Sequence, residues 1–110
     1  MDDLINTIQQ KLKDLNYSIR QLRKTGSDYA EAERNYKVKL RTEALKMRDQ
    51  GLAVGLINMT VYGMEDVANA RQDRDIKEAI YKANQEAINA IKLEIRILDS
   101  QIAREWNSNE

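Results

Sequence analysis

The residues from Gln50 to Met64 read QGLAVGLINMTVYGM, and none of these fifteen residues carries a charge. In the whole chain 33% of the residues are charged, so this uncharged segment (residues 50–64) stands apart. It also holds three of the four glycines, which are Gly51, Gly55 and Gly63. Because highly charged, helix-favouring sequence lies on both sides, we expect the uncharged segment to be the pivot of the fold.

Within the uncharged segment the apolar residues are too dense for a helix with one apolar face. We expect a short helix over residues 53–61, bounded by Gly51 on one side and by Tyr62-Gly63 on the other. A short β-excursion over residues 60–62 is the alternative, because threonine, valine and tyrosine favour strands.

The N-terminal half of the chain has the pattern of two helices, over residues 2–25 and 28–50. In the first, apolar residues recur at spacings of 3 and 4, at Ile5, Ile8, Leu12, Leu15, Ile19 and Leu22. This heptad pattern is typical of coiled-coil packing. Gly26 is expected to end this helix in a left-handed conformation, and Ser27 or Asp28 to cap the next one, which ends at Gly51. So short a connection predicts an antiparallel helical hairpin.

The C-terminal part predicts one long helix over residues 65–106. Its apolar stripe has a mean spacing of 3.75 and consists of Ile76, Ile80, Ala83, Ala87, Ile91, Ile95, Leu98, Ile102 and Trp106. This helix would be roughly 63 Å long, against about 35 Å for each arm of the expected hairpin. The excess length indicates an overhanging end or a second subunit, so we expect that the protein can form a homo-oligomer.

Length and composition complete the expected architecture. The chain of 110 residues fits a single helical domain, residues 1–110, of the all-α class, built like a three-helix, coiled-coil-like bundle. No stretch reaches the roughly 18 apolar residues that a membrane span needs. The acidic start, Met1-Asp2-Asp3, and the absence of cysteine favour a cytoplasmic protein.

The sequence excludes several kinds of catalytic site. Histidine and cysteine are both absent, which rules out Ser-His-Asp and Cys-His nucleophiles and makes a zinc site improbable. No phosphate-binding loop, dinucleotide fingerprint or calcium loop occurs. We therefore expect a protein that is not an enzyme and that needs neither a cofactor nor a metal.

The charges are unevenly distributed along the chain. Residues 11–48 contain eleven basic and five acidic residues, whereas residues 65–110 contain seven basic and ten acidic ones. The two regions could simply be neighbours that attract each other, or the basic hairpin could bind nucleic acid. The candidate nucleic-acid residues are Arg23, Lys24, Arg34, Lys37, Arg41, Arg48, Arg71 and Arg74. A degenerate helix-turn-helix around Gly63 belongs to this alternative, although Met59 and Asn69 then occupy positions meant for a small and an apolar residue.

The preferred hypothesis is a surface for a protein partner. Leu56, Met59 and Tyr62 are the candidate anchors in the uncharged segment, and Trp106 is the candidate at the end of the last helix. The competing interpretation packs Tyr62 into the end of the hairpin. Tyr29 and Tyr36 lie on the apolar stripe of the second helix and are expected in the core.

Three stretches together carry a resemblance: LRKTGSDYAEAERNYKVKLRTEALKMRDQG, VYGMEDVANARQDRD and EAINAIKLEIRILDSQIAREW. The chain resembles a group of small helical proteins that phages and prophages of Gram-positive bacteria encode, largely without assigned function. The resemblance implies a viral accessory protein that acts in the host cytoplasm, and it transfers no functional residue. The function expected is binding of a host or phage protein, of which inhibition of a host defence nuclease would be one form.

Overall fold

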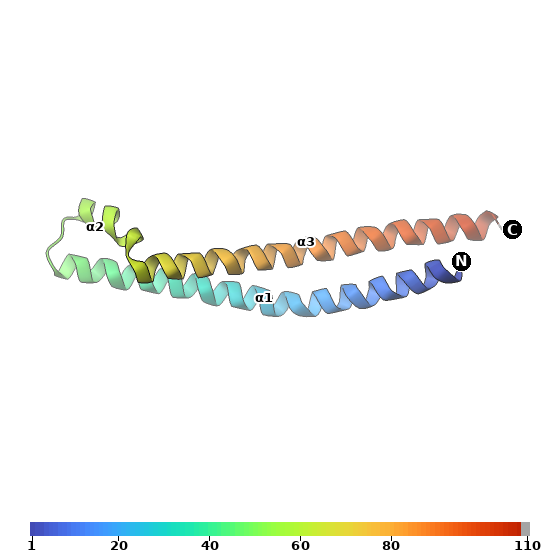
Figure 1. Ribbon diagram of the computed structural model, residues 1–110, viewed down its shortest axis with the longest axis horizontal. Helices are drawn as coiled ribbons and strands as arrows, with labels where there is room; N and C mark the ends of the chain where they lie inside the picture. Colours follow the sequence, from blue (N-terminus) through green and yellow to red (C-terminus); the bar gives the residue numbers. More distant parts are fainter. Residues whose placement is uncertain (109–110) are drawn as a thin grey trace. The chain divides into compact units, whose positions relative to one another are not determined.

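The computed structural model describes residues 1–108, and the elements in this range are all helical (Figure 1). They are α1 (Asp2–Asp49), α2 (Val54–Thr60), the 3-10 helix η1 (Val61–Gly63) and α3 (Glu65–Ser108). The expected all-α class is confirmed. Residues 60–62, the alternative β-excursion, form the end of α2 and the start of η1 instead. None of the helices in this range is both long and apolar enough to cross a membrane.

The predicted break at residues 25–27 is wrong, because α1 continues through them as one helix. Gly26 has no positive φ and therefore does not cap a helix. A Cβ atom at Gly26 would lie 3.1 Å from Cε1 of Tyr81, so the glycine leaves room for an aromatic ring of α3. The partly buried positions also continue without interruption at Leu22, Thr25 and Tyr29. Packing of Gly26 against Tyr81 thus outweighs the roughly 1 kcal/mol that glycine costs in a helix.

The absence of this break removes the predicted mismatch in helix length. α1 has 48 residues and α3 has 44, so neither helix exceeds the other by the margin that the expected hairpin implied. At the end of α3, a carboxylate oxygen of Glu105 lies 3.6 Å from the amino group of Met1. The lengths of the two helices therefore give no indication of a second subunit.

The described chain divides into two compact units. The terminal unit comprises residues 1–24 and 82–108, and the central unit comprises residues 25–81. In the terminal unit the start of α1 packs against the end of α3 in antiparallel direction. The side-chain amide of Asn84 donates a hydrogen bond to the carbonyl oxygen of Ser18 (3.0 Å), and Lys11 forms an ion pair with Glu94. Together with Met1 and Glu105, these contacts set the register of the two helices.

The seam of the terminal unit differs in part from the predicted one. On α1 the partly buried positions include Leu4, Ile8, Lys11, Leu15, Ser18 and Leu22, which again alternate spacings of 4 and 3. The predicted residues Ile5, Leu12 and Ile19 lie one position further and are exposed. Lys11 occupies the seam through its ion pair with Glu94, and at Ser18 the backbone carbonyl oxygen accepts the hydrogen bond from Asn84.

The apolar stripe predicted for α3 is correct only from Ile91 to Ile102, since Trp106 at its end is exposed. Ile91, Ile95, Leu98 and Ile102 are partly buried, whereas Ile76, Ile80, Ala83 and Ala87 are exposed. In the terminal unit the partly buried and buried positions of α3 include Asn84, Ile88, Ile91, Ile95, Leu98 and Ile102, with strict alternation of 4 and 3. α3 therefore has the heptad seam that its sequence did not predict.

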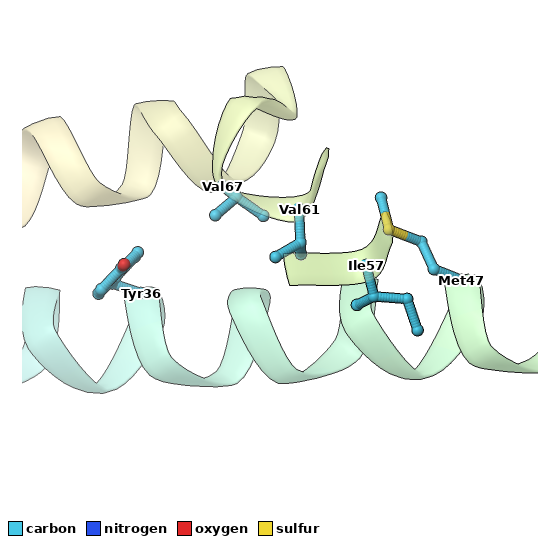
Figure 2. Packing of buried hydrophobic residues seen from close by; sticks show 5 residues of the cluster. All are labelled: Tyr36, Met47, Ile57, Val61 and Val67. Carbon is cyan, nitrogen blue, oxygen red and sulfur yellow. The ribbon is translucent and has the colours of Figure 1, made fainter. Parts of the chain in front are cut away.

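The central unit holds a hydrophobic cluster formed by α1, α2, η1 and α3. Its buried members are Tyr36, Met47, Ile57, Val61 and Val67 (Figure 2). Of the two tyrosines expected in the core, Tyr36 is buried and Tyr29 is partly buried. The cluster joins one face of the uncharged segment to the long helices.

Local signals explain where the helices of the central unit end and begin. Gly51 has φ +87°, and it ends α1 as predicted. Its amide donates to the carbonyl of Arg48 (2.9 Å), and the amide of Leu52 donates to the carbonyl of Met47 (3.1 Å), which is the Schellman pattern. α3 begins at Glu65, as expected from two acidic residues beside the positive end of the helix dipole.

Candidate protein-binding surface

The uncharged segment is buried on one face and exposed on the other. Ile57 and Val61 belong to the hydrophobic cluster, and Figure 2 shows their side chains beside those of Met47 and Val67. The opposite face consists of the apolar outer surface, which we define as Leu56, Met59 and Tyr62. Their exposed fractions are 54%, 82% and 48%. Since Met59 makes so little contact within the chain, packing of this fold does not explain why an apolar residue is there.

An open groove of about 620 Å³ borders this surface. Tyr62 from η1 forms one side, and the first turns of α3 form the rest. The α3 residues that line it are Ala68, Asn69, Arg71, Gln72, Asp75, Ile76 and Ala79. Tyr62 and Ile76 supply exposed apolar area to the lining, while Arg71 and Asp75 supply opposite charges. The groove thus combines apolar and charged side chains, as protein interfaces do.

Tyr62 was predicted from the sequence, but the α3 side of the groove was not. Ala68, Gln72, Asp75 and Ala79 recur at spacings of 4, 3 and 4, so they share one face of a helix. That face mixes small and charged residues, and hydrophobic periodicity alone gives it no signal. The start of α3 directly after Gly63 could have indicated that this face lies next to Tyr62.

Arg74 is engaged within the central unit. Its Nη2 atom lies 2.9 Å from Oδ1 of Asp75, and its guanidinium carbon lies 4.6 Å from the ring centroid of Tyr36. The hydrogen bond from Arg74 to Asp75 raises the pKa of Arg74 above its ordinary value. The side chain therefore stays charged and packs over an aromatic ring, which makes it a structural residue more than a phosphate ligand.

The remaining basic candidates are distributed over both units. In the central unit Arg34, Arg41 and Arg48 are exposed and follow one another at intervals of seven residues, so they form one row along α1. Lys37, beside this row, is paired with Glu33 at 3.6 Å. Arg71 lines the groove. Arg23 and Lys24 are exposed in the terminal unit.

The degenerate helix-turn-helix gains no support from the burial pattern. Met59 and Asn69 would occupy packed positions in such a motif, and both are exposed. Buried packing around the turn comes from Val61 and Val67 instead.

Trp106, the fourth candidate anchor, lies near the end of α3 in the terminal unit and is 61% exposed. It follows Glu105, which is paired with Met1. Leu56, Met59 and Tyr62 belong to the central unit, so Trp106 is a separate candidate contact.

Residues 1–108 contain no group of three or more histidine, cysteine, aspartate or glutamate side chains arranged to hold a metal ion. A scan against protein-family models and searches of curated proteins and of solved structures found no significant match to the chain.

Proposed function

We propose that the protein is a non-enzymatic protein-interaction module of phage or prophage origin, acting in the host cytoplasm, which binds a host or phage protein through its apolar outer surface. The observation that carries the proposal is the exposure of Leu56, Met59 and Tyr62 directly opposite the buried Ile57 and Val61. The cluster needs only the inward face of this segment. The outward face is therefore available to a partner at little cost to the fold.

The chemistry of the surface indicates how a partner would be held. Leu56 and Met59 offer apolar side chains, and the unbranched, flexible methionine adapts its shape to a partner. Tyr62 adds an aromatic anchor beside the groove, where Arg71 and Asp75 can form polar contacts around it. A partner with an apolar side chain flanked by charges of both signs fits this arrangement. Inhibition of a host defence nuclease would be one consequence of such binding.

The test compares substitutions inside and outside the apolar outer surface. Met59→Asp and Tyr62→Ala should each abolish capture of the partner from extract of infected cells, while circular dichroism shows unchanged helicity. Val38→Asp is the matched control, because Val38 is an exposed apolar residue on α1 in the same unit. Proteins retained by the wild type and by Val38→Asp but lost with the two variants are the specific partners. Equal retention by all four proteins would contradict the proposal, and so would loss of helicity in Met59→Asp.

Nucleic-acid binding is the second candidate, and the row of Arg34, Arg41 and Arg48 favours it. At seven-residue intervals these side chains are about 10 Å apart along the helix. Such binding would weaken steeply as the salt concentration rises, because counterions are released from the phosphates. An affinity that stays flat between about 50 and 200 mM salt would eliminate it.

A further inference from the structure

A row of exposed apolar residues on α1 in the terminal unit is symmetric about its own centre. Ile5, Leu12 and Ile19 lie at seven-residue intervals and are each more than a third exposed. They lie outside the seam of partly buried residues through which α1 packs against α3. Seven residues correspond to nearly two helical turns, so the three side chains form one stripe. Leucine stands at the centre and isoleucine at each end.

The neighbouring row has a similar symmetry in its polar groups, centred half a residue further along the helix, between Leu12 and Lys13. Asp2, Gln9, Asn16 and Arg23 are also spaced by seven, are exposed, and lie beside the apolar stripe on the side away from the seam. The row runs from an acid through two amides to a base. If a second copy of this row ran in the opposite direction, the acid would face the base and each amide would face an amide.

We propose that this edge of α1 is the interface for a second copy of the chain, packed antiparallel across a two-fold axis at Leu12. In that arrangement Ile5 of one copy meets Ile19 of the other, and Leu12 meets Leu12. The same arrangement brings Asp2 of one copy within one residue, or about 1.5 Å along the helix, of the level of Arg23 of the other, and Gln9 likewise of Asn16. Both rows therefore pair in one orientation, and the side chains of the polar row span the offset of one residue.

Charge complementarity selects a second copy, in this orientation, over other occupants. A parallel pair would leave Asp2 level with Asp2 and Arg23 level with Arg23, which is unfavourable. An unrelated helix would have to repeat the same order of acid, amides and base. The interface is confined to residues 2–23, so it is independent of the proposed partner surface in the central unit.

The first test measures the mass of the full chain by sedimentation equilibrium. The wild type should sediment with the mass of two chains at high micromolar concentration. Leu12→Glu places two carboxylates opposite each other at the axis and should raise the dissociation constant at least about a hundredfold, to give single chains. Tyr17→Glu is the matched control, because Tyr17 is exposed and lies about 140° around α1 from Leu12. It should stay dimeric.

The second test reverses charges to establish the orientation. Asp2→Lys and Arg23→Glu should each weaken self-association by about tenfold, since each converts two attractive pairs into two repulsive ones. In an equimolar mixture the two variants should associate with one another, because both pairs are then attractive. A wild type that sediments as a single chain would overturn the proposal, and so would a dimeric Leu12→Glu. Failure of the mixed variants to associate preferentially would overturn the antiparallel register.

Discussion

At the scale of single residues, Gly26 shows that a glycine expected to end a helix can instead allow two helices to pack closely. Glycine after a basic helix end is a common termination signal, yet here it lies inside α1. Its role is to allow α3 to approach closely, since a Cβ atom at this position would lie only 3.1 Å from the ring of Tyr81. Tyr29 reinforces this contact, with its ring centroid 6.0 Å from that of Tyr81.

A double-mutant cycle tests this role of Gly26. Gly26→Ala should gain about 1 kcal/mol from helix propensity when Tyr81 has been replaced by alanine. In the wild-type background the gain should be smaller by at least about 0.5 kcal/mol, because Tyr81 has to move away from the new methyl group. Urea unfolding of the four proteins measures the coupling. If the two gains are equal, Gly26 does not serve the contact with Tyr81.

At the scale of elements, glycine has a different function at each end of the connection between α1 and α2. Gly51 needs its left-handed φ, whereas Gly55 lies within α2 and has none. Neither glycine has an atom within 4 Å of a Cβ added to it. Substitution by alanine therefore tests backbone conformation alone.

Gly51→Ala and Gly55→Ala should have opposite effects on stability. The first should lower the free energy of unfolding by about 1 kcal/mol, because alanine is strained in the left-handed region. The second should raise it by up to about 1 kcal/mol through helix propensity and reduced entropy of the unfolded chain. Thermal unfolding of both variants beside the wild type measures the difference. A stabilising Gly51→Ala would show that the Schellman turn is not maintained in solution.

These elements also show which features of the fold are readable from sequence. The end of α1 at Gly51 and the start of α3 at Glu65 depend on residues adjacent in the chain, and both were predicted correctly. The continuity at Gly26 depends on Tyr81, a residue far away in sequence, so no local pattern contains it. The same applies to the seam, where Lys11 is placed by its ion pair with Glu94 and not by hydrophobicity.

The candidate surface also has one part that could be predicted from the sequence and one part that could not. An uncharged window in a charged chain is visible by inspection, and it pointed to Leu56, Met59 and Tyr62. The α3 side of the groove could not be found from hydrophobicity, because residues such as Asn69 and Gln72 acquire meaning only once η1 lies beside them. Charge counts likewise did not show that Arg74 packs over Tyr36.

At the scale of the whole molecule, burial is unequal between the two units. The central unit contains the hydrophobic cluster, whereas among the described residues of the terminal unit only Ile88 is a buried hydrophobic residue. Polar groups such as Lys11 and Asn84 also interrupt the terminal seam. Segments with few buried apolar contacts open at lower free energy than a well-packed core.

Hydrogen exchange should therefore separate the two units. In the Leu12→Glu background, where self-association does not contribute, backbone amides of the terminal unit should exchange faster than those around Val67. Val67→Ala should lower the protection of the central unit by about 2 kcal/mol, because it removes two methyl groups from a fully buried side chain. Val38→Ala is the matched control, since Val38 is 53% exposed, and it should change protection little. Equal protection in the two units, or equal effects of the two valine substitutions, would show that the cluster does not dominate the stability of this protein.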